Sequence, residues 1–138
     1  MIHDKAFAEL TTKELYDILR LRSEVFVVEQ ECAYLDPDGR DDEPGTRHVW
    51  VGTPVDAYLR VLDDGAARRI GRVVTRPSAR SVGLAAQLMK HVLAHVASPW
   101  TLDAQSYLTA WYARFGFVQS GPEFVEDGIP HTPMRRDA

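Results

Sequence analysis

The stretch Arg80-Ser81-Val82-Gly83-Leu84-Ala85 decides the fold, because it follows a predicted strand and opens a predicted helix. Backbone N–H groups in the first turn of a helix have no partner within the helix, and the positive end of the helix dipole lies there. Gly83 and Ala85 are small enough to let a diphosphate approach the backbone closely. Arg80 adds a fixed positive charge that can bind two phosphate oxygens. The stretch therefore predicts an anion site at the head of a helix.

Two other phosphate-binding patterns are absent from the sequence. The chain has no GxxxxGK[ST] motif, which disfavours a P-loop NTPase, and no GxGxxG after its first predicted strand, which disfavours a dinucleotide-binding fold. By itself the RxxGxA pattern of Arg80 to Ala85 is short, and a helix start of this composition is more often only a helix start. The neighbouring segments are therefore needed to distinguish a phosphate site from an ordinary helix start.

Strand-like runs precede the turn, and a helical run follows it. Three runs are rich in β-branched and aromatic residues, namely His48 to Val51, Val55 to Leu62 and Ala67 to Val74. Asp63-Asp64-Gly65 predicts a hairpin turn between the last two. Apolar residues recur at helical spacing from Val82 to Val96, and Thr101 to Ala104 is a short strand. A helix between two strands favours a parallel pair joined by a right-handed crossover.

The two ends of the chain complete the predicted order of elements. A short apolar start around Phe7 to Leu10 precedes the capping-box pair Thr11 and Glu14, which opens a long helix that ends near Glu29. After the parallel pair we expect a short helix and a hairpin, namely Leu108 to Arg114, then Phe117 to Val125 with His131 to Met134, turning at Asp127-Gly128. The order β-α-β-β-β-α-β-α-β-β predicts an α/β fold, a mixed and mostly antiparallel sheet flanked by helices with a central parallel strand pair.

The composition limits the partners and the compartment that we expect. The chain has 138 residues, 45% of them hydrophobic, which predicts one domain over residues 1–138. Its 16 Lys plus Arg against 20 Asp plus Glu give a net charge of −4, without the basic excess that nucleic-acid binding favours. Cys32 is the only cysteine, and no signal peptide or membrane-spanning run is visible. We therefore expect a cytoplasmic protein that binds neither nucleic acid nor membrane.

The histidines and aspartates do not predict a metal site. His91 and His95 lie four residues apart on one helix face, but Val92 stands where the HExxH motif has its glutamate. The run Asp36-Pro37-Asp38-Gly39 lacks the ligand spacing of an EF-hand. We expect no bound metal.

Two segments that flank the turn raise its specificity. Arg72-Val73-Val74-Thr75 precedes it, and Ala110-Trp111-Tyr112-Ala113-Arg114-Phe115-Gly116-Phe117 follows. The combination resembles the GNAT acetyltransferase superfamily. The resemblance implies the GNAT fold, a strand whose backbone pairs with the pantetheine arm of acetyl-CoA, a turn that holds the coenzyme A pyrophosphate, and a tyrosine beside the thioester sulfur.

Further segments are similar to the ElaA-type branch of this superfamily. They are Leu21 to Gln30, Asp36-Pro37-Asp38-Gly39, Arg47-His48 and Asp127-Gly128-Ile129-Pro130-His131. Many relatives have glycine in place of Ala85 and a polar or basic residue in place of Val82, but the pattern tolerates alanine, and the backbone N–H of Val82 is the part expected to act. The resemblance covers nearly the whole chain in the right order.

The resemblance assigns coenzyme contacts to the strand and the turn. These residues are Val73, Val74, Thr75, Arg80, Ser81, Val82, Gly83, Leu84 and Ala85. A backbone N–H near Val74 would meet the thioester oxygen, as in an oxyanion hole. Gln105 ends the parallel strand beside the coenzyme, where its amide can hold pantetheine or substrate.

Acyl transfer to an amine also requires a general acid and a general base. Tyr112 is at the family's tyrosine position, where a phenol with an ordinary pKa near ~10 can protonate the departing thiolate; its alternative is a core-packing tyrosine. Glu29, His48 and His131 compete for the role of base. His48 equally fits a strand histidine satisfied by a neighbour, and Glu29 a structural ion pair with Arg22 or Arg47.

The acidic loop from Tyr34 to Gly45 has two readings. Tyr34, Asp36 and Asp38 can form a rim that selects cationic acceptors, or the segment can be a solvated surface loop. We hypothesise an N-acetyltransferase that transfers acetyl or another short acyl group from coenzyme A to a primary amine of a small molecule or a peptide. A GNAT-fold module that senses acyl-CoA without turnover and a general nucleotide or phosphate binder remain alternatives. Exposed edge strands would permit a homodimer.

Overall fold

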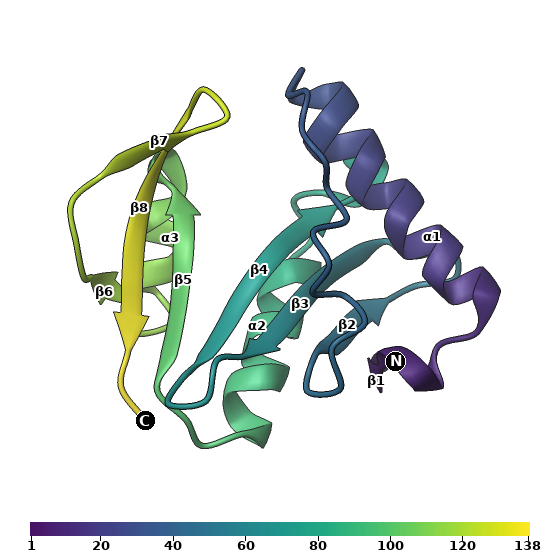
Figure 1. Cartoon of the computed structure of the whole chain (residues 1–138), viewed down its shortest axis with the longest axis horizontal. Coiled ribbons are helices and arrows are strands. Elements are labelled where there is room, and N and C mark those ends of the chain that lie inside the picture. Colours follow the sequence, from purple (N-terminus) through teal and green to yellow (C-terminus); the bar gives the residue numbers. More distant parts are fainter.

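A computed structural model describes all 138 residues, which form one mixed sheet with helices on both faces (Figure 1). The strands are β1 (Ile2–Ala6), β2 (Arg47–Val51), β3 (Ala57–Asp63), β4 (Arg68–Thr75), β5 (Trp100–Gln105), β6 (Val118–Gln119), β7 (Phe124–Glu126) and β8 (Ile129–Arg136). The helices are α1 (Thr12–Arg22), α2 (Leu84–His95) and α3 (Thr109–Ala113), with shorter helical segments at Phe7–Glu9, Ser23–Glu29, Pro77–Ala79 and Ser106–Leu108. None of the helices combines the length and hydropathy that crossing a bilayer requires.

The strand order is β1-β2-β3-β4-β5-β8-β6, and β7 pairs with β8 beside β6. All neighbouring strands are antiparallel except β4 and β5, which are parallel. The crossover between them contains α2, because a parallel pair needs a connection long enough to return the chain to the same end of the sheet. The predicted mixed sheet with a central parallel pair is confirmed.

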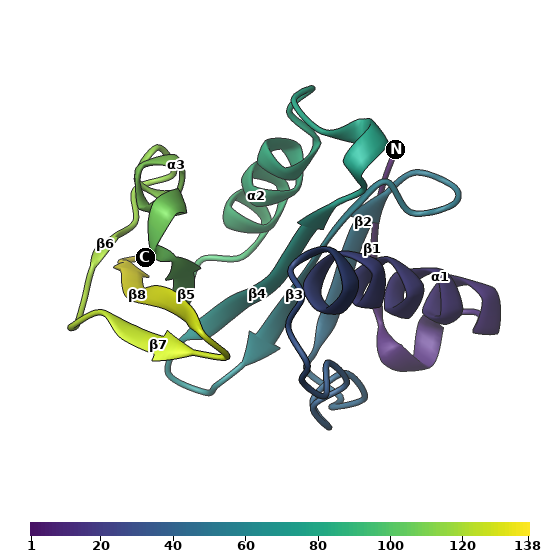
Figure 2. The ribbon, with the colours of Figure 1, turned by 90° about the horizontal axis from the view of Figure 1, so that it is seen from above.

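Two hydrophobic clusters hold the helices on opposite faces of the sheet (Figure 2). On one face Leu88 and Met89 of α2 and Tyr112 of α3 pack with alternate residues of the central strands, such as Leu59 and Leu102. On the other face the buried stripe of α1 packs with the intervening residues; this cluster contains Ile18, Leu21, Val25, Trp50, Tyr58, Val55 and Val74. The period-two alternation of the strands therefore separates an α2/α3 face from an α1 face.

The N-terminal elements differ from the sequence prediction in two places. The apolar start at Phe7 to Leu10 contains a short 3-10 turn, and the first strand is β1, whose residues pair with β2. The capping box is present: Thr11 Oγ1 accepts from the Glu14 N–H at 3.1 Å, and Glu14 accepts from the Thr11 N–H at 2.9 Å. The long first helix continues beyond α1 as the π-helical segment Ser23–Glu29. This segment reaches one wall of the cleft described below.

The C-terminal hairpin also differs from its prediction. The expected single strand from Phe117 to Val125 is divided into β6 and β7, which pair with different parts of β8. Gly121 and Pro122 lie between them, and proline has no N–H to donate to a ladder. The turn at Asp127-Gly128 is where the sequence predicts it, with both residues at positive φ.

Candidate active site

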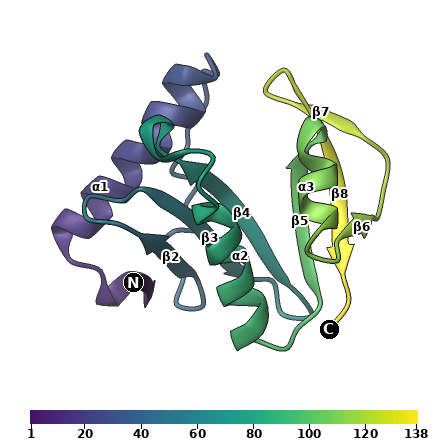
Figure 3. The same ribbon diagram turned by 180° about the vertical axis from the view of Figure 1, so that it is seen from behind.

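A cleft of about 850 Å³ lies where β4 and β5 diverge. The two strands pair only at Arg68 with Trp100 and at Arg69 with Thr101. Figures 1 and 3 show the strands separating from this end toward their carboxyl ends. Beyond Arg69 the edge of β4 that faces β5 has no strand partner, and Val73, Val74 and Thr75 line the cleft. An unpaired edge of this kind can hydrogen-bond an extended ligand that carries amide groups.

A β-bulge lies in β4 at the middle of the cleft. The register with β3 shifts between Tyr58, opposite Val74, and Arg60, opposite Gly71. Arg72 lies within the shift and has a φ of 52°, which is unusual for a residue with a side chain. Bulges bend a strand and interrupt its ladder. The bulge therefore accompanies the divergence of β4 from β5.

The turn before α2 presents a run of free backbone donors. Ser81 has a φ of 69° and Gly83 a φ of 82°, and α2 begins at Leu84. None of the backbone N–H groups from Ser81 to Ala86 donates a hydrogen bond within the protein; the first that does is Gln87, to the Gly83 carbonyl at 3.1 Å. A Cβ placed on Gly83 would meet no atom within 4 Å, so the space at this position is open. Successive free N–H groups at a helix N-terminus form an anion site.

Arg80 joins this turn to the end of the π-helical segment. Its guanidinium binds Glu29 with N···O distances of 3.0 and 2.9 Å, and its Nε donates to the Thr75 carbonyl at 3.1 Å. The ion pair of Glu29 is therefore with Arg80 rather than with Arg22 or Arg47, which bind other carboxylates. Val82 is exposed and lies outside the cleft lining, so only its backbone is placed to act there.

Tyr112 lies on α3 with its ring in the core. The ring is 7% exposed and packs edge-on against Trp111 and Phe117. Its hydroxyl forms no hydrogen bond within the protein and is not fully buried. It is therefore accessible from the cleft that Tyr112 lines. Burial, with a smaller contribution from Tyr107, raises the pKa of Tyr112 above its ordinary value. Tyr112 therefore presents a neutral phenol to the cleft.

His131 and Gln105 lie side by side on the α1 face of the sheet, opposite to the face that holds Tyr112. They are directly paired across β5 and β8. Ala104, which precedes Gln105, and Met134, three residues after His131, belong to the core cluster on the α2/α3 face, and the alternation of the strands turns Gln105 and His131 the other way. The amide of Gln105 donates to Gln30 at 3.2 Å, which bridges the cleft to the π-helical end. His131 Nδ1 lies 2.8 Å from the carbonyl oxygen of Ile129. Both side chains line the cleft.

His48 does not lie at the cleft. It is fully buried, with Nε2 at 2.9 Å from the Asp41 carbonyl and Nδ1 at 2.7 Å from the Tyr58 hydroxyl. A carbonyl only accepts, so Nε2 carries the proton, and Nδ1 accepts from Tyr58. Burial lowers the pKa of His48. Since both ring nitrogens are used, His48 is a structural residue, and we withdraw it as a candidate base.

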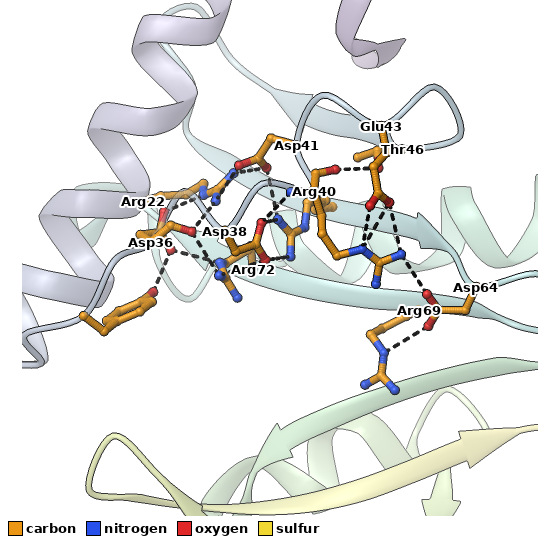
Figure 4. A network of polar contacts seen from close by, with 12 residues as sticks. Arg22, Asp36, Asp38, Arg40, Asp41, Glu43, Thr46, Asp64, Arg69 and Arg72 are labelled. Atoms are coloured by element: carbon orange, nitrogen blue, oxygen red, sulfur yellow. Dashed lines mark hydrogen bonds and ion pairs between the residues drawn. The ribbon is translucent and has the colours of Figure 1, made fainter.

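The acidic loop is held to the protein by buried arginines (Figure 4). Arg22, with a side chain that is 0% exposed, binds Asp36 at 2.8 Å and Asp41 at 2.7 Å, and Arg60 binds both oxygens of Asp38 at 2.8 Å. Burial alone would raise the pKa of Asp38 and Asp41, but hydrogen bonds from these arginines outweigh it and hold both values below the ordinary range. Asp36, Asp38 and Asp41 are therefore not a free cation-selecting rim, because arginines neutralise them, while other residues of the loop, such as Leu35 and Asp42, are exposed to solvent.

The sequence indicated Tyr34 as part of this wall but not the arginines that hold it. Tyr34 donates to Asp36 at 2.6 Å and lines the cleft together with Leu35. Arg72 binds Asp36 at 2.9 Å, and its guanidinium lies 5.8 Å from the centre of the Tyr34 ring. One feature of the sequence could have indicated these ion pairs. Arg60 is a charged residue within a mostly apolar strand, and a buried charge needs a partner of opposite charge.

No three His, Cys, Asp or Glu side chains are grouped so that they could hold a metal ion. His91 and His95 stack with ring centres 4.3 Å apart, and His91 pairs with Asp4 at 3.0 Å. Their contacts are those of a surface helix.

A parallel pair that splays around a cleft, with an anion-binding turn at the carboxyl end of its first strand, defines the fold of the acyl-CoA N-acyltransferases. Solved structures agree: an acyl-CoA N-acyltransferase from Pseudomonas aeruginosa superposes with a TM-score of 0.91 at 44% identity, over 99% of each chain. Escherichia coli ElaA superposes with a TM-score of 0.92 at 37% identity, also over 99% of each chain.

Sequence comparison gives the family. The model of the acetyltransferase (GNAT) domain matches residues 47–138. A UPF0039 protein of Mycobacterium tuberculosis is 48% identical over 136 residues, which are 93% of this chain and 87% of the relative. Escherichia coli ElaA is 38% identical over 144 residues, which are 97% of this chain and 94% of ElaA. The chain belongs to the GNAT acetyltransferase family, and it is similar to ElaA along nearly its whole length.

Proposed function

We propose that the protein is an N-acetyltransferase that moves acetyl, or another short acyl group, from coenzyme A to a primary amine by direct attack, with residues 1–138 acting as one domain. One observation carries the proposal. A single cleft contains the free backbone donors of the Ser81 to Ala86 run, the unpaired edge of β4 and the accessible hydroxyl of Tyr112. These features match, in order along the cleft, a diphosphate, an amide-bearing arm and a leaving thiolate.

The coenzyme end of the cleft would use backbone groups before side chains. The diphosphate would accept from the N–H groups of Ser81 to Ala86, and the pantetheine amides would pair with the edge of β4 between Val73 and Thr75. Arg80 would add a charge-assisted contact, for which its guanidinium has to share or leave Glu29. Gln105 would face the arm from β5.

The reaction forms one bond and breaks another. The neutral amine attacks the thioester carbon, the carbonyl oxygen takes negative charge, and a backbone N–H near Val74 stabilises it. The C–S bond then breaks, and Tyr112 protonates the leaving thiolate. The raised pKa of Tyr112 keeps this proton in place at neutral pH. A base in the cleft takes one proton from the ammonium form before the attack, and the second proton of the nitrogen afterwards restores the phenol of Tyr112.

A thiol-release assay with acetyl-CoA and a panel of primary amines tests the proposal, with calorimetry of coenzyme A and ATP on the same samples. We expect release above the uncatalysed rate with at least one amine and weaker binding of ATP. Binding of acetyl-CoA without release for any amine would instead support a sensor of acyl-CoA. Comparable affinity for ATP and coenzyme A would support a general phosphate binder.

A further inference from the structure

The acceptor amine needs a base, and the two remaining candidates differ in what they already bind. An amine reaches the cleft largely as an ammonium ion at neutral pH and has to lose a proton before it attacks. The carboxylate of Glu29 is held by Arg80, at the coenzyme end of the cleft. His131 makes no contact with a charged group, and it lies on the α1 face of the sheet.

The tautomer of His131 follows from its only hydrogen bond. Its Nδ1 lies 2.8 Å from the Ile129 carbonyl, and a carbonyl cannot donate, so Nδ1 carries the hydrogen. In the neutral ring Nε2 is then the atom with the free lone pair. Nε2 forms no hydrogen bond within the protein and is not fully buried, so it is accessible from the cleft. A backbone carbonyl that fixes one nitrogen prepares the other as a base.

Phe124 fixes the plane of the ring. Its ring stacks on that of His131 with centres 5.6 Å apart and planes 18° apart, because the two residues are directly paired across β7 and β8. Rotation of the imidazole would therefore break both the stacking and the hydrogen bond to Ile129. The hairpin holds its histidine in one orientation.

The acid and the base lie on opposite faces of the sheet. Tyr112 belongs to the cluster on the α2/α3 face, whereas His131 shares the α1 face with Gln105. The gap between β4 and β5 joins the two faces, because residues from both line one cleft. A thioester in this gap would expose its sulfur toward Tyr112 and its carbonyl carbon toward an amine that arrives from the side of His131.

We propose that His131 is the general base for the acceptor amine, acting through Nε2, and that Phe124 is the residue that positions it. This inference rests on the proposed N-acetyltransferase function. The ammonium ion gives one proton to Nε2 before its nitrogen attacks. When the C–S bond breaks, Tyr112 protonates the thiolate, and the second proton of the nitrogen restores the phenol of Tyr112. The imidazolium then returns its proton to solvent.

The charged and titratable groups around this histidine are mostly acidic. Glu126 and Asp127 follow on the same hairpin, Asp103 lies on β5 and pairs with Arg69, and Tyr107 follows β5. Glu29 lies across the cleft with Arg80. Glu126 and Asp127 form no ion pair, so they leave negative charge at the mouth through which an ammonium ion would arrive.

His131→Asn is the sharpest variant, because the asparagine amide can keep the hydrogen bond to the Ile129 carbonyl while the base is lost. We expect kcat/KM for the amine to fall by about 10²- to 10⁴-fold, with the Kd for coenzyme A unchanged. The decline of kcat/KM at low pH in the wild type should disappear in the variant, and added imidazole should restore part of the rate. His95→Asn, on the exposed end of α2, is the matched control and should keep wild-type kinetics.

The positioning role of Phe124 is tested by the kcat of its variants in the same reaction. Phe124→Leu should lower kcat by about tenfold, since a misoriented base loses part of its effect, and Phe124→Tyr should restore it. A purely structural role would lower the melting temperature and leave kcat of the folded protein unchanged, which would overturn the positioning role.

His131→Asn turnover within threefold of wild type, with the decline at low pH retained, would overturn the inference. If Glu29→Gln then removed that decline, the base would be Glu29. Both results leave the proposed function intact, because the wild type still turns over. A wild type that binds acetyl-CoA and releases no thiol with any amine would overturn the proposed function itself and the base with it.

Discussion

Replacing Arg22 by methionine would remove the cation that holds the acidic loop on α1. The Arg22 side chain is 0% exposed and donates four hydrogen bonds to Asp36 and Asp41. Its loss leaves Asp36 with only one arginine, Arg72, at 2.9 Å, and Asp41 with only Arg60, at 3.1 Å. Breaking a buried pair completely costs about 3–5 kcal/mol, and because each carboxylate keeps one cationic partner we take the lower end, about 3 kcal/mol. For a chain of 138 residues, about 1 kcal/mol lowers the melting temperature by about 3 °C. We therefore expect a decrease of about 9 °C.

Thermal denaturation followed by circular dichroism measures this change, and Lys13→Met in the same helix is the control. Lys13 is 76% exposed and pairs with Asp17 on the surface, where such a pair contributes less than about 0.5 kcal/mol. Its melting temperature should stay within about 2 °C of wild type. If Arg22→Met also stayed within that range, the loop would not depend on the buried arginine, and our account of this wall of the cleft would be wrong.

Three further variants test the coenzyme turn, the acid and the buried histidine. Arg80→Ala should weaken coenzyme A binding by more than about fivefold in calorimetry, against no change for the exposed Arg20→Ala; a Kd within twofold of wild type would contradict the phosphate contact. Tyr112→Phe should lower kcat by about 10²- to 10⁴-fold at an unchanged Kd for coenzyme A, and an unaffected kcat in the thiol-release assay would exclude the acid role. Because burial lowers the pKa of His48, the unfolded chain takes up a proton below about pH 6.5 that the folded protein does not, so the free energy of unfolding should fall between about pH 7 and 5. Urea titrations should show a smaller fall for His48→Gln, and an equal fall in both proteins would refute this.

Local patterns in the sequence were sufficient for the central elements of the fold. The helical spacing after Gly83 and the strand-like run before it predicted α2 and β4, and the order of elements predicted the parallel pair. One strand was missed and another was not recognised as divided, because the evidence for both is not local. β1 is a polar edge strand whose only strand partner, β2, lies about forty residues further along the chain, and β6 and β7 share one partner on either side of Gly121-Pro122.

For the candidate site, too, the sequence predicted what local motifs contain and missed what distant contacts determine. Tyr112 and the turn residues follow from motifs that are contiguous in the chain, so the sequence could place them. The burial of His48 could not be predicted, because it depends on Tyr58 and on a carbonyl of the acidic loop. Likewise, five acidic residues in one segment indicate a solvated loop, and the sequence does not show that Arg22 and Arg60, from two other elements, bind three of them.

The central claim is that one cleft holds the coenzyme between the turn before α2 and the hydroxyl of Tyr112. A crystal structure with bound acetyl-CoA tests it most directly. We predict the diphosphate within hydrogen-bond distance of the N–H groups of Ser81 to Ala86, pantetheine along β4, and the sulfur nearer to Tyr112 than to His131. Coenzyme bound outside the gap between β4 and β5, or a sulfur remote from Tyr112, would contradict the account.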